Sequence, residues 1–594
     1  MYIVKQPVKG KDYFYLRKSV RENGKVVSKS VAYLGKTKTD AEKRFKELKN
    51  HGKLEDFENK ILGKNDMKKL ETEKNMDQEK MKKTESESIK NKEIKVSTDE
   101  KEFLSFLNES GLVWGPSPEI YGGLAGFYTY GPLGKLLKNK VEDSIRKIFN
   151  SNGLRELESP TILPDSVWKA SGHLETFKDR TINCSKCKAV FRADKLIEEK
   201  YDVPADSFSN EKILNFIDEK GIKCPSCKGL MEKSIDTQSL MMKTKVAGKD
   251  ASLRPETATG TYLPFTRFYN YFRKKLPLGV FQIGKAYRNE ISPRQHVLRG
   301  REFTQAEGQM FVDPETKNNW EKYELIKGEK LPFWNSESQE SDKSVVKITV
   351  AEALKKGDIK SQAYGWCIWL AYTQFINLGI PSDRIRLRQH HPDEKAFYAD
   401  DAWDIEVKLN NYGWFEMCGV HDRTDYDLTQ HSKFSGVKLE AARENGEKFV
   451  PHVLEIAFGT DRPTYALIDI FYDKKEEGEG KSMFKIPYWI APIDCAIFPL
   501  VKKPELFKIA EDIKESLERE FVVEYDLAGS IGKRYLRSAV AGIPYAITVD
   551  FDSIENGDVT LRDRDTEKQV RVKISELKNI LRKLINQELS FDKL

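Results

Sequence analysis

Four of the seven cysteines form two closely spaced pairs, Cys184 with Cys187 and Cys224 with Cys227. A Cys-x-x-Cys turn directs both sulfurs at one ion, and two such turns supply the four thiolates of a tetrahedral zinc site. Four protein ligands leave no open coordination position, so this zinc would hold an inserted subdomain together and take no part in a reaction. The alternative is four unrelated structural cysteines.

Arginine and glutamate cluster in the second half of the chain. Arg288-Asn289-Glu290 follows an apolar run at 278–283, and a loop rich in Pro, Arg and Gln leads to Arg-Gly-Arg-Glu-Phe at 299–303. One such arginine is suited to an α-phosphate, a second to the outer phosphates, and the phenylalanine to an adenine ring. Charged antiparallel strands carry the same alternation for purely structural pairing, and this segment taken alone favours structural pairing over phosphate binding.

A later segment, Glu-Ile-Ala-Phe-Gly-Thr-Asp-Arg at 455–462, joins an expected strand to a helix that begins near Pro463. Gly459 permits close approach of the backbone to a ligand, and Arg462 at the helix start would enter the same pocket. The two segments would then place their basic residues around one anion.

In this order the clusters resemble the three motifs of class II aminoacyl-tRNA synthetases. Motif one would be a helix at 134–149 that leads into residues 155–162, motif two would be 288–303 and motif three 459–462. Longer strings resemble the glycyl-tRNA synthetases of the homodimeric, archaeal and eukaryotic-like type. They include ASGHLETF at 170–177, RPETATG at 254–260, QIGKAYRNEISPR at 282–294, GWFEMCGVHDRTDYDLTQH at 413–431 and GSIGKRYLR at 529–537. The resemblance covers residues 103–592.

The resemblance implies an α+β fold. An antiparallel-sheet catalytic domain would occupy 101–180 and 236–472, interrupted by a zinc-binding insertion at 181–235 and followed by an α/β anticodon-binding domain at 484–594. It also implies a glycine--tRNA ligase that uses ATP and Mg²⁺ to form glycyl-adenylate and then transfers glycine to the 3′ end of tRNA(Gly). The implied partners are glycine, tRNA(Gly) and a second copy of the chain, packed through motif one, and Zn²⁺ would be structural.

For ATP, the resemblance gives Arg288 and Arg462 catalytic roles. Arg288 would stabilise charge at the α-phosphate, and Phe303 would stack on adenine. Glu455, helped by Glu416, would hold Mg²⁺. The full set of implied ATP residues is Arg288, Asn289, Glu290, Arg299, Glu302, Phe303, Glu416, Glu455, Gly459 and Arg462.

For glycine, the resemblance places Glu256, Glu290 and Glu416 around the ammonium group and Arg386 on the carboxylate. The full implied set is Arg192, Glu256, Glu290, Glu307, Arg386, Glu416 and Ala457. Ala457 stands where the family commonly has serine, which removes a hydrogen bond worth about 1 kcal/mol. Thr259 likewise replaces a glutamine of the family.

Composition limits what else the chain could be. The length of 594 residues exceeds one domain, and no run of about eighteen apolar residues appears, so a membrane span is not expected. Lysines at positions 5, 9 and 11 stand where a secretion signal would be apolar, so a cytoplasmic location is expected. Residues 1–50 hold 14 Lys or Arg against 5 Asp or Glu, which fits either nucleic-acid binding or an ordinary solvated surface.

The elements expected outside the motifs are as follows. Residues 1–50 are predicted to form a basic β-rich module with strands at 13–16, 26–27 and 31–34 and a helix at 36–50, followed by a charged linker at 51–100. In the C-terminal block, strands at 495–500, 521–525 and 546–550 are predicted to alternate with helices at 506–520 and 574–587.

Two other functions fit parts of the sequence. The first is a catalytically inactive synthetase-like protein that binds tRNA or serves as an accessory subunit, and the second is a ligase for another small amino acid. An inactive protein would have no reason to keep Arg288, Glu290, Phe303, Glu455 and Arg462 together. The module at 1–50 could bind tRNA, bind a protein or have no present role.

Overall fold

The computed structural model describes residues 2–35 without 9, 10, 23 and 24, residue 39, and residues 98–594 without 199, 202, 204, 206, 207, 292, 294, 342, 393, 396, 397 and 475–481. They belong to two compact units, residues 1–93 and residues 94–594. The predicted helix at 36–50 and most of the predicted linker lie outside the described residues.

The first unit contains a three-stranded antiparallel sheet in the order β1-β2-β3, formed by β1 (Tyr2–Val8), β2 (Lys11–Glu22) and β3 (Lys25–Gly35). The predicted strands at 13–16, 26–27 and 31–34 are confirmed as parts of β2 and β3. Strand β1 was not predicted, because lysine, glutamine and proline interrupt its apolar residues.

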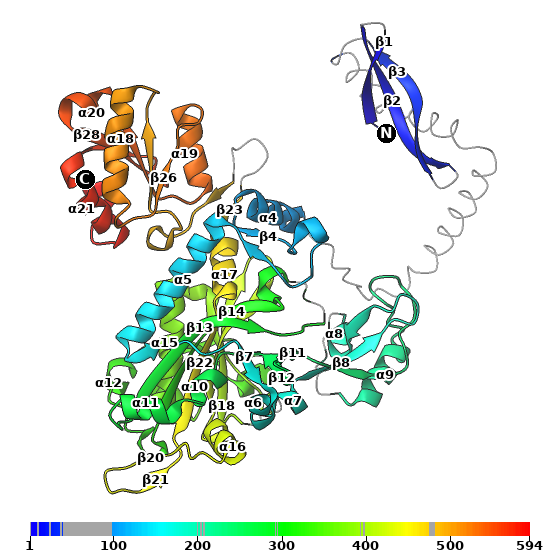
Figure 1. Ribbon diagram of the computed structural model, residues 1–594, viewed down its shortest axis with the longest axis vertical. Helices are drawn as coiled ribbons and strands as arrows, with labels where there is room; N and C mark the ends of the chain where they lie inside the picture. The colour runs from blue at the N-terminus through cyan, green and yellow to red at the C-terminus, as the bar shows by residue number, and fades with distance from the viewer. Residues whose placement is uncertain are drawn as a thin grey trace. The chain divides into compact units, whose positions relative to one another are not determined.

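A nine-stranded sheet forms the centre of the second unit, in the order β16-β15-β17-β18-β19-β22-β14-β13-β6 (Figure 1). Its neighbours are antiparallel except β13 with β6 and β15 with β17, which confirms the expected sheet. The strands are β6 (Leu154–Glu156), β13 (Leu278–Tyr287), β14 (Glu302–Val312), β15 (Lys330–Trp334), β16 (Val346–Thr349), β17 (Ile385–Gln389), β18 (Asp401–Leu409), β19 (Gly413–Asp422) and β22 (His452–Gly459).

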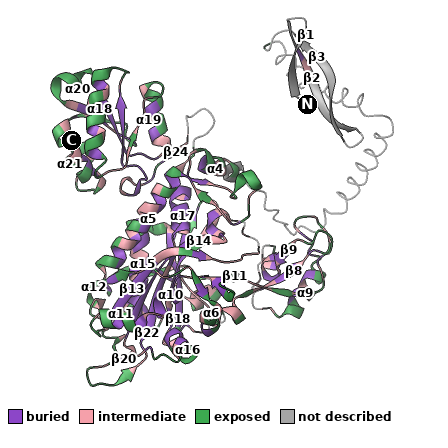
Figure 2. Ribbon diagram, in the orientation of Figure 1, coloured by how far each residue is buried: buried purple, intermediate pink, exposed green. Residues whose placement is uncertain are grey.

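Three helices cover this sheet: α5 (Pro132–Ser151), α15 (Gln362–Asn377) and α17 (Asp461–Phe471). Helix α15 packs on β19 and β22, and α17 packs on α5 and β14. In α5 the residues Leu137, Val141, Ile145 and Phe149 recur every fourth position, so they form one buried stripe. Figure 2 shows this buried layer of sheet and helices inside an exposed outer surface.

Shorter elements surround the sheet. Helix α4 begins at Thr98, inside the segment predicted as linker. These elements are α4 (Thr98–Glu109), β4 (Val113–Trp114), β5 (Thr129–Tyr130), β7 (Ile162–Pro164), α6 (Asp165–Ala170), α7 (His173–Thr176), β11 (Met242–Val246), β12 (Lys249–Leu253), α10 (Thr259–Tyr262), α11 (Phe265–Tyr271), α12 (Tyr323–Ile326), α13 (Ser336–Glu340), α14 (Val350–Lys356), α16 (Tyr426–Ser435), β20 (Ala441–Ala442), β21 (Lys448–Phe449), β23 (Tyr472–Asp473) and β24 (Met483–Phe484).

The insertion has its own small sheet and core. Strands β8 (Lys178–Asn183), β9 (Val190–Arg192) and β10 (Asp236–Ser239) pair in the order β10-β8-β9, beside α8 (Ala193–Glu198) and α9 (Asn210–Glu219). Ile182, Leu196 and Ile213 form its hydrophobic cluster together with Cys184 and Cys224. Because β8 starts at Lys178, the subdomain begins three residues before the predicted boundary at 181.

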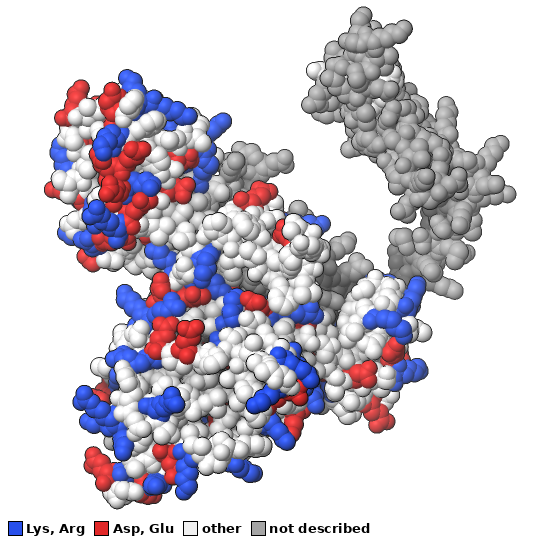
Figure 3. Space-filling model, in the orientation of Figure 1, with Lys and Arg blue, Asp and Glu red and all other residues white. Residues whose placement is uncertain are grey.

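The C-terminal block is an α/β domain in which a five-stranded sheet has the order β26-β25-β27-β28-β29. The three strands and two helices predicted here are confirmed within a few residues. The elements are β25 (Cys495–Pro499), α18 (Pro504–Leu517), β26 (Val523–Tyr525), α19 (Ile531–Val540), β27 (Tyr545–Val549), α20 (Phe551–Asn556), β28 (Asp558–Asp563), β29 (Gln569–Lys573) and α21 (Ile574–Ile585). On the face in Figure 3, this domain carries both signs of charge side by side. In the part of the chain that the structure describes, no helix combines the length and apolarity needed to cross a bilayer.

The close approach of α5 to the segment before β4 gives a test of the packing. A Cβ on Gly134 would lie 1.8 Å from the carbonyl oxygen of Leu112. The backbone at Leu112 cannot move out of the way as the end of a flexible side chain could. Gly134→Ala should therefore lower the free energy of unfolding by about 2 kcal/mol or more. A Cβ on Gly532 in α19 would meet nothing within 4 Å, so Gly532→Ala should be neutral or stabilise by about 0.5 kcal/mol. Calorimetry of both variants measures this, and an unfolding temperature of Gly134→Ala equal to wild type would contradict the packing.

Candidate active site

A cavity of about 450 Å³ lies over the three adjacent strands β14, β22 and β19. Its walls carry residues 303, 305 and 307 of β14, residues 455, 457 and 459 of β22, and residues 417, 419 and 421 of β19. Each set has a spacing of two, so all three point from the same face of the sheet. The register aligns Glu307 with Ala457 and Ala457 with Gly419, which brings the three strands into one wall.

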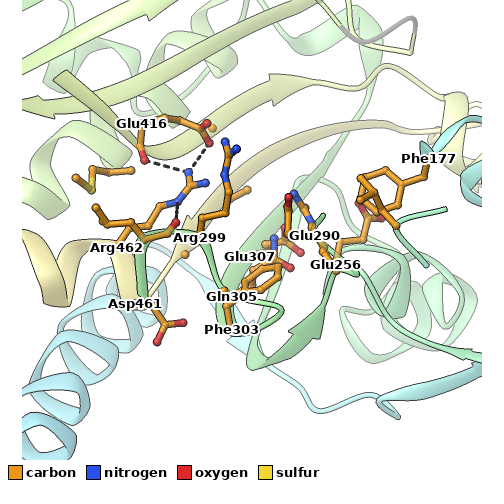
Figure 4. A pocket seen from close by; sticks show the side chains of 18 of the residues that line it. Phe177, Glu256, Glu290, Arg299, Phe303, Gln305, Glu307, Glu416, Asp461 and Arg462 are labelled. Carbon is orange, nitrogen blue, oxygen red and sulfur yellow. Dashed lines mark hydrogen bonds and ion pairs between the residues drawn. The ribbon is translucent and has the colours of Figure 1, made fainter. Parts of the chain in front are cut away.

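Arg288, Arg299 and Arg462 line one part of the cavity and come from three different elements. Arg288 directly follows β13, Arg299 ends the short 3-10 helix at His296–Arg299, and Arg462 lies in the first turn of α17. Figure 4 shows Arg299 and Arg462 at one end of the view, beside Glu416. Arg462 Nη1 donates to Glu416 Oε1 at 2.8 Å, and Arg462 holds the pKa of Glu416 below its usual range. Three arginines gathered in one part of the cavity form an anion-binding surface.

Arg288 is held between two aromatic rings. Its guanidinium lies 5.4 Å from the ring centre of Phe177 and 5.4 Å from that of Phe303. Its Nε also donates to the carbonyl oxygen of Pro255 at 3.1 Å. These contacts fix the direction of the cation while leaving it on the cavity wall.

Glu256, Glu307 and Glu455 form the acidic part of the cavity. Glu307 and Glu455 are each only 3% exposed. The loop at 254–260 holds two of the acids: the Thr257 N–H donates to Glu307 Oε2 at 2.8 Å, and Thr259 Oγ1 donates to Glu256 Oε1 at 2.8 Å. The threonine that departs from the family sequence therefore orients a cavity carboxylate.

The three carboxyls do not share one protonation state. Burial, with Glu455 and Glu256 nearby, raises the pKa of Glu307 to about 8. Burial also opposes ionisation of the other two, but His173 lowers the pKa of Glu256 and Arg423 lowers that of Glu455. At neutral pH the proton of this cluster is held by Glu307.

Arg423 supplies the opposite charge behind the acidic wall. It is buried, its Nε and Nη2 donate to Asp427 at 2.7 and 3.0 Å, and its Nη1 donates to Glu455 Oε1 at 3.3 Å. Its guanidinium also lies 4.2 Å from the ring centre of Tyr398. His421 Nδ1 donates to the same Glu455 oxygen at 3.0 Å. Arg423 and His421 were missed from the sequence, although both stand in the string at 413–431.

The insertion adds a charged wall to the cavity. Arg192 from β9 pairs with Asp194 at 2.5 Å and with Asp179 from β8 at 3.5 Å. Glu290 acts electrostatically on both Arg192 and Asp179, so it belongs to this wall. Arg192 and Glu290 therefore reach the cavity as expected, but from the side of the insertion.

The structure does not bring every expected residue to the site. Among the described residues that line the cavity, Asn289, Glu302 and Arg386 do not occur. Glu302 pairs with Lys285 at 2.9 Å. Arg386 pairs with Glu406 at 2.5 Å, and its guanidinium lies between Trp334 and Trp414, at 4.1 and 4.4 Å from the ring centres.

Two expected roles also differ from the observed geometry. The buried acidic cluster is Glu256 with Glu307 and Glu455, whereas Glu416 pairs with Arg462. The carboxylate of Glu455 is engaged by Arg423, His421 and Tyr262. That arrangement suits a pocket wall and does not fit a Mg²⁺ ligand, which needs free oxygens beside phosphate.

The four paired cysteines come together in the insertion. Their sulfurs all lie within 4.8 Å of one another, with Cys184 and Cys227 at 3.5 Å and Cys187 and Cys224 at 3.7 Å. The Cys187 N–H donates to Cys184 Sγ and holds the pKa of that thiol at about 6. Zinc–sulfur bonds of about 2.3 Å span such a set in a tetrahedron, so these residues fit a zinc ion.

Comparisons with known proteins agree with this geometry. The family model "tRNA synthetase class II core domain (G, H, P, S and T)" matches residues 243–471, and "Anticodon binding domain" matches residues 494–584. The glycine--tRNA ligase of Pyrococcus horikoshii is 39% identical over 82% of this chain and 99% of its own length. That of Methanothermobacter thermautotrophicus is 37% identical over 82% of this chain and its full length, 100%. The chain belongs to the glycine--tRNA ligase family.

Membership of the glycine--tRNA ligase family confirms the resemblance inferred from the motifs and the expected fold class. A solved prolyl-tRNA synthetase of Cryptosporidium parvum has a TM-score of 0.50 at 17% identity, and the match covers 84% of this chain and 79% of that one. At this identity the likeness concerns the fold alone. The C-terminal α/β domain coincides with the anticodon-binding model, as predicted.

The raised pKa of Glu307 gives a prediction about stability. The folded pKa of about 8 exceeds the ordinary value of 4.5, so between these pH values the folded state holds a proton that the unfolded state has lost. Stability contributed at this site therefore falls as pH rises through that window and is constant above it. Glu307→Gln removes the titrating group. The unfolding temperature of the variant minus that of the wild type should therefore increase as the pH rises from about 4.5 to 8.

Calorimetry across this pH range measures the difference. Glu321→Gln replaces an exposed acid of the same domain and should follow the wild-type curve. A difference between Glu307→Gln and wild type that does not change with pH would contradict the assignment of the proton to Glu307.

Proposed function

We propose that the protein is a glycine--tRNA ligase that activates glycine with ATP and transfers it to tRNA(Gly). The observation that carries this proposal is a single cavity with buried carboxylates in one part and three arginines in another, on a chain of this family. In the first step a carboxylate oxygen of glycine attacks the α-phosphorus and pyrophosphate leaves. In the second step a ribose hydroxyl at the 3′ end of the tRNA attacks the glycyl carbonyl, and AMP leaves.

The arginines supply the electrostatic part of the first step. Arg288, fixed between Phe177 and Phe303, is placed to stabilise charge on the α-phosphate, and preorganised cations contribute most where charge develops. Arg299 and Arg462 bind the outer phosphates. The Mg²⁺ that accompanies ATP would be held by its phosphates and the exposed carboxylate of Glu416. No general base is required, because the glycine carboxylate is already ionised.

The acidic cluster supplies the glycine site. An ammonium group fits among Glu256, Glu307 and Glu455, since two of these acids are ionised and the third ionises readily beside a cation. Three carboxylates also fix the orientation of the substrate, so an added methyl would point into the cavity wall. Steric exclusion of that methyl group would select glycine, which has no side chain, over alanine.

Further components follow from the same proposal. The four cysteines hold a structural zinc, the chain forms a homodimer through the α5 region, and the C-terminal domain binds the anticodon of tRNA(Gly). A ligase of tRNA works where tRNA is used, in the cytoplasm. The alternative of an inactive accessory protein is disfavoured because the arginines and carboxylates needed for activation share one cavity.

ATP–pyrophosphate exchange with each of the twenty amino acids tests the proposal. Glycine should support exchange, and alanine and serine should do so far more weakly. Charging of tRNA(Gly) with glycine should accompany it. No exchange with any amino acid would favour the accessory protein, and exchange with alanine equal to that with glycine would overturn the assigned glycine site.

The protonation of Glu307 predicts how glycine binding depends on pH. The ammonium group needs the ionised carboxylate, so the KM for glycine should fall as pH rises from about 6.5 to 8.5, while the KM for ATP should not follow this profile. Glu307→Gln should raise the KM for glycine and flatten its pH dependence. The measurement is exchange at varied glycine concentration and pH. An unchanged profile in the variant would show that another group titrates.

Zinc is tested by metal analysis of purified protein. One zinc per chain is expected, and Cys184→Ser and Cys224→Ser should each lose it, because three remaining thiolates bind more weakly than four. Cys367→Ala removes a buried cysteine outside the cluster and should keep the metal. Zinc content that survives both serine variants would contradict the site.

A further inference from the structure

A buried lysine on α5 lies behind the arginines of the cavity. The side chain of Lys138 is 3% exposed, and its Nζ donates to Asp461 Oδ1 at 2.5 Å and to Thr304 Oγ1 at 2.9 Å. The same Nζ lies 4.5 Å from the ring centre of Tyr130. A charged amine this deeply buried is costly unless it is fully paired, and here its pairing is with the first residue of α17.

Asp461 ties the start of α17 to three elements, α5, β5 and β14, of which β14 lines the cavity. Its Oδ1 also accepts from Tyr130 Oη at 2.7 Å, and its Oδ2 accepts from the backbone N–H of Thr304 on β14 at 2.6 Å. The N–H of Thr460 donates to the carbonyl oxygen of Thr304 at 2.8 Å. Thr304 and Asp461 are each next in the chain to a residue that lines the cavity: Phe303 precedes Thr304, and Arg462 follows Asp461.

The direction of the Asp461 side chain matters for Arg462. Figure 4 shows the Asp461 carboxylate turned away from Arg462 and Arg299, toward the pale blue helix. Burial opposes its ionisation, but Lys138 and the hydrogen bonds outweigh burial and keep the pKa of Asp461 below its usual range. Without Lys138, an ionised carboxylate would remain buried in the wall. Lys285 interacts electrostatically with Asp461 but already pairs with Glu302. The next cation along the chain is Arg462, which the carboxylate would then draw away from Glu416 and the cavity.

We propose that Lys138 is a positioning residue of the ATP site. By holding Asp461, it fixes the start of α17 against β14, so that Arg462 and Phe303 point into the cavity and Arg462 stays free of the adjacent carboxylate. Lys138 itself touches no substrate. The inference rests on the proposed function, because it assigns the phosphates and adenine of ATP to this part of the cavity.

Lys138→Met tests this role, since methionine has similar length and no charge. The loss of a hydrogen-bonded charge should raise the KM for ATP in pyrophosphate exchange by about tenfold or more. The KM for glycine should stay within about twofold of wild type, because the acidic cluster depends on Arg423 and the loop at 254–260. A merely structural role would move both constants together.

A second substitution separates charge pairing from packing. Lys138→Met combined with Asp461→Asn removes both charges with nearly the same shape, so the KM for ATP should return most of the way toward wild type. Lys355→Met makes the same change at an exposed helical position, in α14, and should leave both KM values unchanged. A double variant no better than Lys138→Met would overturn the proposal, and so would equal increases in both KM values or no increase at all.

Tyr130→Phe keeps the test available if Lys138→Met does not fold. It removes only the hydroxyl that donates to Asp461 and should raise the KM for ATP about twofold to fivefold with the KM for glycine unchanged. A wild-type KM for ATP in Tyr130→Phe would overturn the proposal. If the wild-type protein shows no glycine-dependent exchange, the proposed function is wrong. If the wild-type protein is active but the variants do not raise the KM for ATP while leaving the KM for glycine unchanged, only the role of Lys138 is wrong.

Discussion

The constraint on which the site depends is the burial of several carboxylates in one wall of the sheet. Glu256, Glu307 and Glu455 face one cavity, and like charges at this distance cannot all ionise without a buried cation. Arg423 is that cation, held by Asp427 and by the rings around it. One guanidinium leaves the cluster short of positive charge, which the ammonium group of glycine would supply under the proposed function.

The antiparallel sheet makes this concentration of charge achievable. Alternate residues of β14, β22 and β19 share a face, so three short stretches of chain deliver carboxylates, a small residue at 457 and glycines to one wall. The arginines come instead from the segments just beyond the strands, where the chain turns. The acidic and basic parts of the cavity therefore come from different stretches of chain, which under the proposed function would receive the ammonium group of glycine and the phosphates of ATP.

The sequence predicted those elements and sites whose residues recur at a regular spacing. The C-terminal strands and helices, the helix of motif one and the paired cysteines were predictable because each has a regular spacing. Arg386 was assigned wrongly to the cavity region because a string identifies a residue without showing that two tryptophans and Glu406 enclose it. Arg423 was missed for the converse reason: a buried arginine next to His421 is recognisable only when Glu455 comes to lie against it from a distant strand.

Two buried ion networks support the cavity, one centred on Arg423 and one on Lys138. Buried ion pairs seldom stabilise a fold more than apolar residues of equal size would, because desolvation cancels most of the attraction. The stability of the fold therefore does not explain why the cavity wall contains these two ion networks. Each network instead fixes the direction of one carboxylate: Arg423 holds Glu455 in the acidic wall, and Lys138 holds Asp461 away from Arg462. The two networks approach the sheet through different helices, α16 and α5, so each positions its own part of the wall, and the bond from Arg288 to Pro255 joins the two parts.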